Sequence, residues 1–245
     1  MKAKRLVAVL TAVSLMAGLC GMAEPNADQK IKLEQNSTST PALGGKLLYD
    51  GYTLQWADDF NGSELNRGDW NIELHAPGWV NNELQAYVDS PENIYLENGS
   101  LVIKPIEQKN PDGTVSYTSG RVNTQNKHDF KYGIFEARIK VPEGQGFLPA
   151  FWMMPTNENL YGQWPRCGEI DIMEVLGNDT DKSYGTIHYG NPHSESQGSY
   201  QLTAGSFSEE YHNFAVEWEP GRISWYVDGC LIHTENDWYL SLIHI

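Results

Sequence analysis

Residues 164–175 read WPRCGEIDIMEV, with three carboxylates placed between apolar side chains. Side chains of a strand point alternately to its two faces, so Glu169 and Asp171 share one face. Glu174 would face the core in a regular strand, where an unpaired carboxylate is very costly. A β-bulge at Ile172-Met173 adds one residue and returns Glu174 to the face of the other two acids. The stretch therefore predicts a bulged strand that presents a line of three acids.

Such a line of carboxylates suits the cleavage of glycosidic bonds. One acid attacks the sugar or activates water, and a second, protonated acid releases the leaving oxygen. Glu169 and Glu174 would take these parts, with Asp171 as a proton-sharing neighbour. Their Cα atoms would lie on the order of 13 Å apart along the bulged strand. The residues alone leave open whether the carboxyl groups form a retaining or an inverting pair. A half-buried strand whose acids merely face water is the alternative.

The rest of the chain predicts an all-β fold. Short runs of β-branched and aromatic residues recur between turns marked by 23 Gly and 12 Pro. We find no long helical periodicity beyond the first residues, which favours a sandwich or jelly roll. Asp228-Gly229 is a strong signal for a hairpin turn. Strands are expected at 100–104, 133–141, 150–154, 169–175, 184–189, 213–218 and 223–227.

Several motifs lie on both sides of the acids, in the order Ser119–Arg121, Lys131–Arg138, Pro149–Pro155, His188–Gly190 and Glu217–Arg222. With the Glu-Ile-Asp-Ile-Met-Glu core they resemble glycoside hydrolase family 16, of the laminarinase or endo-β-1,3-glucanase type. The likeness spans roughly residues 48 to 238. The inserted Met173 resembles the bulged branch of that family rather than its lichenase and xyloglucan branch. The resemblance implies a β-sandwich jelly roll of two curved antiparallel sheets with a concave substrate cleft.

The resemblance also implies a role for each acid. In the family the first Glu is the nucleophile, the Asp assists it and the last Glu is the acid/base, within a retaining mechanism. Carried over by position, these residues are Glu169, Asp171 and Glu174. His188 resembles the active-site histidine of the family, so we expect it beside the acids.

Aromatic residues suit a sugar-binding cleft, and the chain holds eight Trp and thirteen Tyr. Sugars offer apolar faces to rings and hydroxyls to polar groups. Trp152 and Trp164 lie close in sequence to the acids and are the main candidates for stacking. The resemblance adds sugar contacts from Asn82 and Arg121, although Arg121 could instead pair with an acid. Other tryptophans in strand-like patterns are expected in the core: Trp56, Trp70, Trp218 and Trp225.

No cofactor is expected for the chemistry. The resemblance implies one structural Ca²⁺, bound by Asp59 and the carbonyl oxygen of Gly99. The third ligand of the family has no counterpart in this chain, and a missing oxygen ligand weakens such a site. Cys167 and Cys230 are expected to be two small buried thiols, with a disulfide between them as the alternative.

The first residues predict export. Three positive charges precede an apolar run at 6–19, and Gly21-Met22-Ala23 fits a signal peptidase site. We therefore expect a signal peptide at 1–23 and a secreted or periplasmic protein, with lipoprotein anchoring through Cys20 as the second choice. The apolar run is shorter than the roughly 20 residues that span a bilayer, so we expect no membrane span.

The remaining chain divides into a polar linker at 24–45 and a catalytic domain at 46–239. The family continues for several strands beyond Trp238, so we expect the domain to be incomplete at its C-terminus. Missing strands would leave unpaired sheet edges, and the domain would then fold poorly or be inactive. Residues 240–245 do not resemble the family and are expected to be a non-native tail.

The formal net charge of −15 argues against nucleic acid as a partner, because phosphate binding needs clustered Lys and Arg. A neutral β-glucan is easier to reconcile with it. The resemblance implies a secreted, monomeric endo-acting glycoside hydrolase that cleaves laminarin-type β-1,3-glucan by double displacement. The alternatives are a hydrolase of mixed-linkage glucan or agar, and a non-catalytic glucan-binding module.

Overall fold

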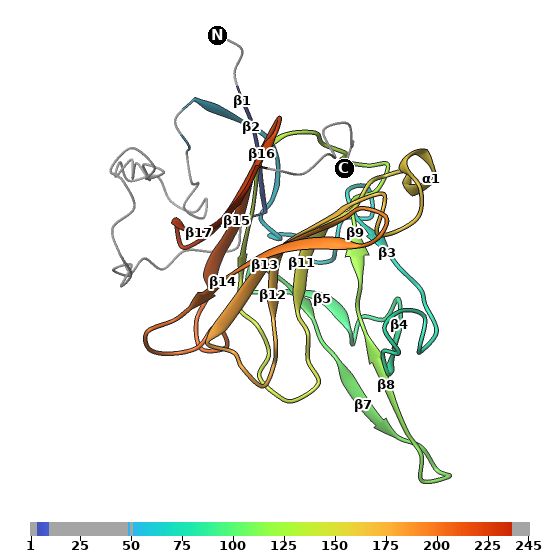
Figure 1. Ribbon diagram of the computed structural model, residues 1–245. Coiled ribbons are helices and arrows are strands. Elements are labelled where there is room, and N and C mark those ends of the chain that lie inside the picture. The colour runs from blue at the N-terminus through green and yellow to red at the C-terminus, as the bar shows by residue number, and fades with distance from the viewer. Residues whose placement is uncertain (1–3, 10–48, 50, 237–245) are drawn as a thin grey trace. The chain divides into compact units, whose positions relative to one another are not determined.

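The computed structural model describes residues 4–9, 49 and 51–236, and these form two compact units. The first unit contains the described residues up to Asp58 and from Phe130 onward; the second contains Asp59–Asp129. Strands dominate both units, and one short helix, α1, covers Glu158–Tyr161 (Figure 1). The prediction of an all-β fold is confirmed.

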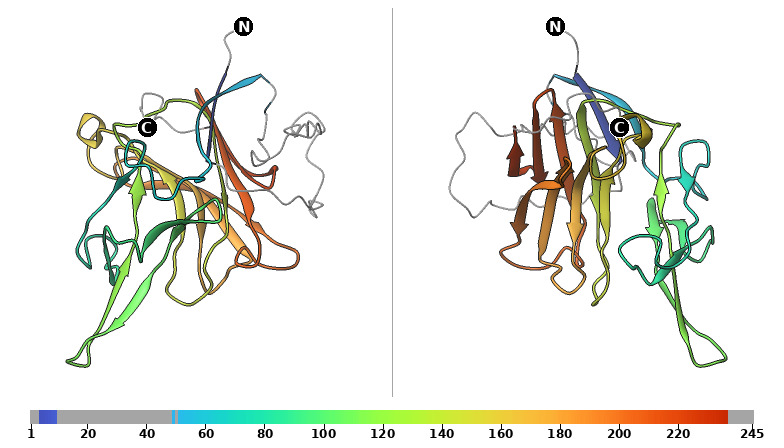
Figure 2. Two further views of the ribbon diagram at one scale, coloured as in Figure 1. Left: turned by 180° about the vertical axis from the view of Figure 1, so that it is seen from behind. Right: turned by 45° about the vertical axis from the view of Figure 1, so that its right-hand side comes forward.

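A six-stranded sheet forms one layer of the first unit, in the order β17-β16-β15-β10-β1-β2 (Figure 2). β1 runs parallel to its neighbours β2 and β10, whereas the pairs β10–β15, β15–β16 and β16–β17 are antiparallel. The sheet is therefore mixed rather than purely antiparallel, because β1 pairs in parallel with both of its neighbours. Its strands are β1 (Lys4–Val9), β2 (Tyr52–Asp58), β10 (Gly133–Ile139), β15 (His212–Glu219), β16 (Arg222–Val227) and β17 (Cys230–Glu235).

A four-stranded antiparallel sheet forms the second layer of the first unit, in the order β11-β12-β13-β14. It contains the strand that carries the three acids. Its members are β11 (Ala150–Met153), β12 (Glu169–Val175), β13 (Lys182–Tyr189) and β14 (Ser194–Gln201).

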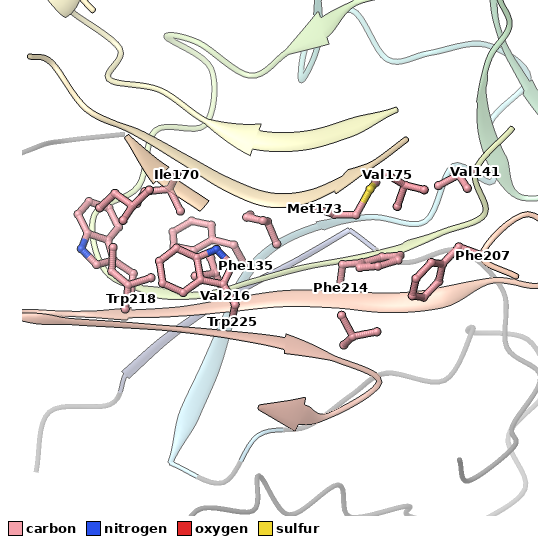
Figure 3. Close-up of a cluster of buried hydrophobic side chains, with 14 residues drawn as sticks. Phe135, Val141, Ile170, Met173, Val175, Phe207, Phe214, Val216, Trp218 and Trp225 are labelled. Carbon is pink, nitrogen blue, oxygen red and sulfur yellow. The ribbon is translucent and has the colours of Figure 1, made fainter. Parts of the chain in front are cut away.

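The core of the first unit lies between these two sheets. Figure 3 shows Ile170, Met173 and Val175 of β12 pointing toward side chains of the opposite sheet. Alternate residues of β15 and β16 meet them, as expected for strands that bury one face. Burying large apolar side chains contributes about 1.5–3 kcal/mol each to stability, so this core holds the acid-bearing strand in place. The facing residues of β15 and β16 are Phe214, Val216, Trp218, Ile223, Trp225 and Val227.

The second unit contains three small sheets, with the strand orders β3-β9, β4-β8-β7 and β5-β6. Phe60 and Trp70 pack together in its interior. The strands are β3 (Asn71–Ile72), β4 (Gln85–Tyr87), β5 (Ile94–Glu97), β6 (Ser100–Ile103), β7 (Ile106–Lys109), β8 (Val115–Ser119) and β9 (Val122–Asn123).

All seven strands named from the sequence are present, with bounds that differ by at most two residues. The Asp228-Gly229 turn joins β16 to β17, and both residues have positive φ, 48° and 76°. Trp218 and Trp225 are fully buried, as expected. The expectation of two free thiols is wrong for Cys230, which is disulfide-bonded, whereas Cys167 is a buried free thiol. The alternative bridge between these two cysteines is therefore also wrong.

Some of the expectations concern residues outside the described part of the chain. These are most of the expected leader, the whole of the linker, and the last nine residues with the expected tail. Lys4–Val9, which belong to the expected leader, form strand β1. The leader, the linker and the incomplete C-terminus stay predictions. In the described part of the chain, no helix has the length and apolar character needed to cross a membrane.

Candidate active site

The three acids of β12 reach one face because the strand is bulged. Asp171 pairs with Thr186 on β13, and Glu174 pairs with Tyr184, so three steps along β12 match two along β13. The residues inserted between the acids, Ile172 and Met173, are both 1% exposed in the core. The predicted bulge is confirmed, and it turns Glu174 away from the apolar interior.

Neighbouring strands add residues to the same face, because directly opposed residues of antiparallel strands project on the same side. Glu169 lies opposite His188 of β13, and His188 lies opposite Glu195 of β14. Trp152 of β11 lies opposite Asp171. The sheet therefore builds a row of acids, imidazole and indole across its exposed face.

Asp171 and His188 form an ion pair within this row. The Nε2 atom of His188 lies 3.3 Å from Oδ2 of Asp171. Burial raises the pKa of Asp171, and the hydrogen bond from His188 opposes this shift in part. The same hydrogen bond raises the pKa of His188, because the carboxylate stabilises the imidazolium. His188 thereby fixes the orientation of the central acid.

Glu174 is a group that can donate a proton near neutral pH. Burial, followed by the negative charge of Asp171, raises its pKa from the ordinary 4.5 to about 7. His188 opposes the shift through its positive charge. A carboxyl group with such a pKa is protonated in part of the population at pH 7 and can act both as acid and as base.

Glu169 is in a different environment from Glu174. The indole Nε1 of Trp164 donates a hydrogen bond of 2.6 Å to Oε2 of Glu169. A donor at this atom stabilises the negative charge of the carboxylate. One carboxylate held as an acceptor and one carboxyl held as a proton donor, on the same face, can carry out acid-assisted nucleophilic displacement at a sugar.

The sequence did not predict two further residues of this face, His193 and Glu195. Nδ1 of His188 lies 3.0 Å from Nε2 of His193 and 3.4 Å from Oε2 of Glu195. The β13–β14 pairing brings Glu195 opposite His188, and the connection between the strands brings His193 there. The Asn191-Pro192 turn before Ser194 could have indicated this hairpin.

The two sugar-contact candidates of the second unit are Asn82 and Arg121. Arg121 donates through Nε to Oε2 of Glu73 at 3.0 Å, and its guanidinium lies 5.0 Å from the centre of the Trp79 ring. His75 stacks on Trp79 at 3.5 Å. Asn82 is exposed, in a turn with φ of 54°. Arg121 thus pairs with an acid, which is one of the two roles that the sequence allowed for it.

The sequence also did not predict the role of Glu73 in this cluster. Burial tends to raise its pKa, but hydrogen bonds from Asn123, His75 and Arg121 prevail and lower it. These contacts join parts of the chain that are about fifty residues apart. A charged Glu73 therefore organises the polar cluster of the second unit.

The residues expected to bind calcium, Asp59 and Gly99, both belong to the second unit. The backbone N–H of Asn61 donates to Oδ1 of Asp59 at 3.4 Å, and Oδ1 of Asn61 lies 3.3 Å from the Cβ position of a side chain built at Gly99. Calcium takes six to eight oxygen ligands, of which Asp59 and Gly99 would supply only part. The calcium site stays a prediction.

Comparisons with known proteins agree with this geometry. The model of glycosyl hydrolases family 16 matches residues 78–238. The glucan endo-1,3-beta-glucosidase A1 of Niallia circulans is 36% identical over 88% of this chain and 33% of its own length. The glucan endo-1,3-beta-glucosidase of Cryptopygus antarcticus is 39% identical over 77% of this chain and 71% of its own. This chain thus spans a third of the first of these relatives.

A solved structure shares the fold. The laminarinase catalytic domain of Thermotoga maritima is 41% identical and superposes with a TM-score of 0.65. The match covers 74% of this chain and 76% of that domain. With a family match over most of its residues, this chain belongs to family 16 of the glycosyl hydrolases.

Proposed function

We propose that this protein is an endo-acting glycoside hydrolase that cleaves β-1,3-glucan of the laminarin type with retention of configuration. The observation that carries the proposal is the contrast between two acids on one face of β12. Glu174 has a pKa of about 7, whereas Glu169 accepts a hydrogen bond from Trp164. The names of the similar proteins support a β-1,3-linked substrate.

In the first step, Glu169 attacks the anomeric carbon while Glu174 gives its proton to the glycosidic oxygen. The bond between that carbon and oxygen breaks, and the released sugar chain leaves with the proton. A covalent ester then joins the remaining sugar to Glu169. Glu174 is left as a carboxylate.

In the second step, Glu174 accepts a proton from a water molecule as its oxygen attacks the anomeric carbon. The ester bond breaks, Glu169 is released as a carboxylate, and Glu174 is again protonated. A pKa of about 7 lets Glu174 serve in both directions. Two displacements at one carbon return the sugar to its original configuration.

Asp171 and His188 are positioning residues in this proposal. The negative charge of Asp171 contributes to the raised pKa of Glu174, so it keeps the acid protonated before the first step. His188 in turn holds Asp171 through the 3.3 Å ion pair. No cofactor takes part in either step.

The remaining parts of the proposal concern the substrate and the whole protein. Trp152 and Trp164 would stack on sugar rings, and Asn82 and Arg121 would contact sugar hydroxyls. The catalytic domain would cover 46–239, behind a cleaved leader at 1–23 and a linker, in a secreted or periplasmic monomer.

The release of reducing ends from laminarin, lichenan and agarose tests the proposal. We expect release from laminarin by the wild-type protein, and a loss of about 10²–10⁴-fold in Glu174→Gln because proton transfer is removed. Glu210→Gln, at an exposed glutamate of the same unit, is the matched control and should retain full activity. Retention of laminarin without any release, by a protein with a sharp thermal transition, would show a binding module instead. Release only from agarose or lichenan would overturn the linkage.

A further inference from the structure

His188 has a second ring nitrogen that faces away from Asp171. Its Nε2 atom is directed at Asp171, while Nδ1 faces His193 and Glu195. The two imidazole rings lie 5.2 Å apart and are nearly parallel, with an interplanar angle of 27°. Neither His193 nor Glu195 exchanges a proton or a bond with substrate in the proposed hydrolysis.

The three facing atoms have the spacing of a metal site. His188 Nδ1 and His193 Nε2 are 3.0 Å apart, and Oε2 of Glu195 lies 3.4 Å from the first and 3.9 Å from the second. The point equidistant from these three atoms lies about 2.0 Å from each, which matches Zn–N and Zn–O bond lengths. Three ligand atoms already converge without backbone movement.

We propose that His188, His193 and Glu195 form a Zn²⁺ site, hereafter the rim site, beside the three acids. Two imidazoles and one carboxylate are the donors that zinc accepts, whereas calcium and magnesium prefer oxygen alone. The side chains of His193 and Glu195 are 39% and 53% exposed, so an ion can reach them from solution. A water molecule would supply a fourth ligand.

The contact between His188 and Asp171 strengthens the assignment. A metal-binding histidine usually donates its other ring N–H to a carboxylate, which fixes the tautomer and raises the basicity of the ligand nitrogen. Asp171 stands in that position, 3.3 Å from Nε2. The rim site therefore has an outer partner as well as three ligands, and this partner is one of the acids of the catalytic strand.

The consequence for activity rests on the proposed function. Zn²⁺ at the rim site replaces a proton on Nδ1 of His188, which stays paired with Asp171 through Nε2. The ion also lies beside Trp164, whose ring centre is 5.2 Å from that of His193. Obstruction of the Trp164 surface slows hydrolysis. The rim site is thus a reversible inhibitory site.

Direct binding is the first test, because it does not depend on hydrolysis. Zn²⁺ is titrated calorimetrically into the full protein, free of any polyhistidine tag, and Co²⁺ binding is followed by its visible absorption spectrum. We expect one site in the wild-type protein. His193→Gln and Glu195→Gln should each weaken binding by more than about tenfold, since losing even an outer-shell partner weakens metal sites by about 10–100-fold. His212→Gln, which removes a histidine elsewhere on the first unit, should bind as the wild type does.

Hydrolysis of laminarin with and without Zn²⁺ is the second test. We expect inhibition of the wild type that a chelator reverses, and resistance to Zn²⁺ in His193→Gln and Glu195→Gln, which stay active in chelator. Glu169, Asp171 and His188 also gather ligand atoms within 4.8 Å of one another. Unchanged Zn²⁺ binding in both variants would place the ion on that group and overturn the rim site. Absence of binding to the wild type would overturn it as well. Binding without any hydrolysis would refute the proposed function and leave the rim site standing.

Discussion

The indole Nε1 of Trp225 donates a hydrogen bond of 2.8 Å to the backbone carbonyl oxygen of Asp171. Trp225 belongs to the six-stranded sheet and Asp171 to the four-stranded sheet, so this bond crosses the core. It ends at the bulge, where the regular strand pairing is interrupted. Gly185 of β13 makes room for the ring, because a Cβ atom there would lie 2.5 Å from Cδ1 of Trp225. The core thus holds the bulge that aligns the acids.

Trp225→Phe should lower both stability and activity. The variant keeps an aromatic ring but removes the N–H group, which leaves the buried Asp171 carbonyl oxygen without this donor. An unsatisfied buried acceptor costs about 1–3 kcal/mol, and a domain of this size loses about 2–4 °C in Tm for each kcal/mol. Differential scanning calorimetry and laminarin hydrolysis measure the two effects.

Trp218→Phe is the control for Trp225→Phe, because Trp218 is equally buried and loses the same ring atoms. We expect a smaller loss of Tm, from the reduced packing alone, and a smaller loss of kcat, since the bulge keeps its support. Equal losses of kcat in the two variants would mean that Trp225 acts only through packing.

The bulge and the sharing of one face by the acids were predictable from local sequence. Glu169, Asp171 and Glu174 lie within six residues, so the period of the strand and the cost of burying a carboxylate determine their arrangement. Sequence runs between turn signals likewise predicted the strands. These relationships are local, because each lies within a short stretch of sequence.

The missed features depend on pairing between distant segments. Trp225 is 54 residues from Asp171, and no local pattern indicates that its N–H group reaches that carbonyl. Glu195 approaches His188 only through the register of β13 and β14. The contact between Glu73 and Arg121 likewise spans 48 residues. The packing of one sheet on the other and the register of paired strands, rather than composition, decide these contacts.

The pH dependence of kcat/KM should show an alkaline limb near pH 7. Glu174 must carry a proton to release the leaving oxygen, and burial raises its pKa to about 7. Each pH unit above this value lowers the protonated fraction about tenfold. Initial rates on laminarin at low substrate concentration measure this limb. A profile that stays flat well above pH 7 would exclude Glu174 as the proton donor.

Glu136→Gln should change how stability depends on pH. Burial raises the pKa of Glu136 from 4.5 to about 7, against the opposing hydrogen bond from Tyr49. The folded protein therefore binds more protons than the unfolded chain between these values. The contribution of Glu136 is fully present below about pH 4.5 and is lost as the pH rises through about 7.

The amide of Glu136→Gln cannot ionise, and its oxygen can still accept from Tyr49. We expect the variant to gain stability relative to the wild type as the pH rises from about 4.5 to about 8, as measured by Tm. Glu92→Gln, at an exposed position of the second unit, should leave the pH dependence as it is. Parallel Tm curves for wild type and Glu136→Gln would contradict the raised pKa.

Trp164→Phe should reduce activity without a change in stability. The indole is 48% exposed, so its replacement leaves the core intact. The variant keeps a ring for sugar stacking but loses the 2.6 Å hydrogen bond to Glu169. Hydrogen bonds to charged groups contribute about 1.5–3 kcal/mol, less when exposed, so we expect a loss on the order of tenfold in kcat. An unchanged kcat with a raised KM would restrict Trp164 to substrate binding.

The assignment of Glu169 and Glu174 is tested most directly by chemical rescue of Glu174→Ala. The substrates are laminarin and an aryl β-laminaribioside, whose phenolate leaves without a proton. We predict that the variant loses activity on laminarin but still releases one burst of phenol, because Glu169 forms its ester unaided. Azide should then speed turnover and give the β-glycosyl azide, since it attacks that ester without a base. An equal loss on both substrates with no effect of azide, in a variant that melts as the wild type does, would contradict the two-acid assignment.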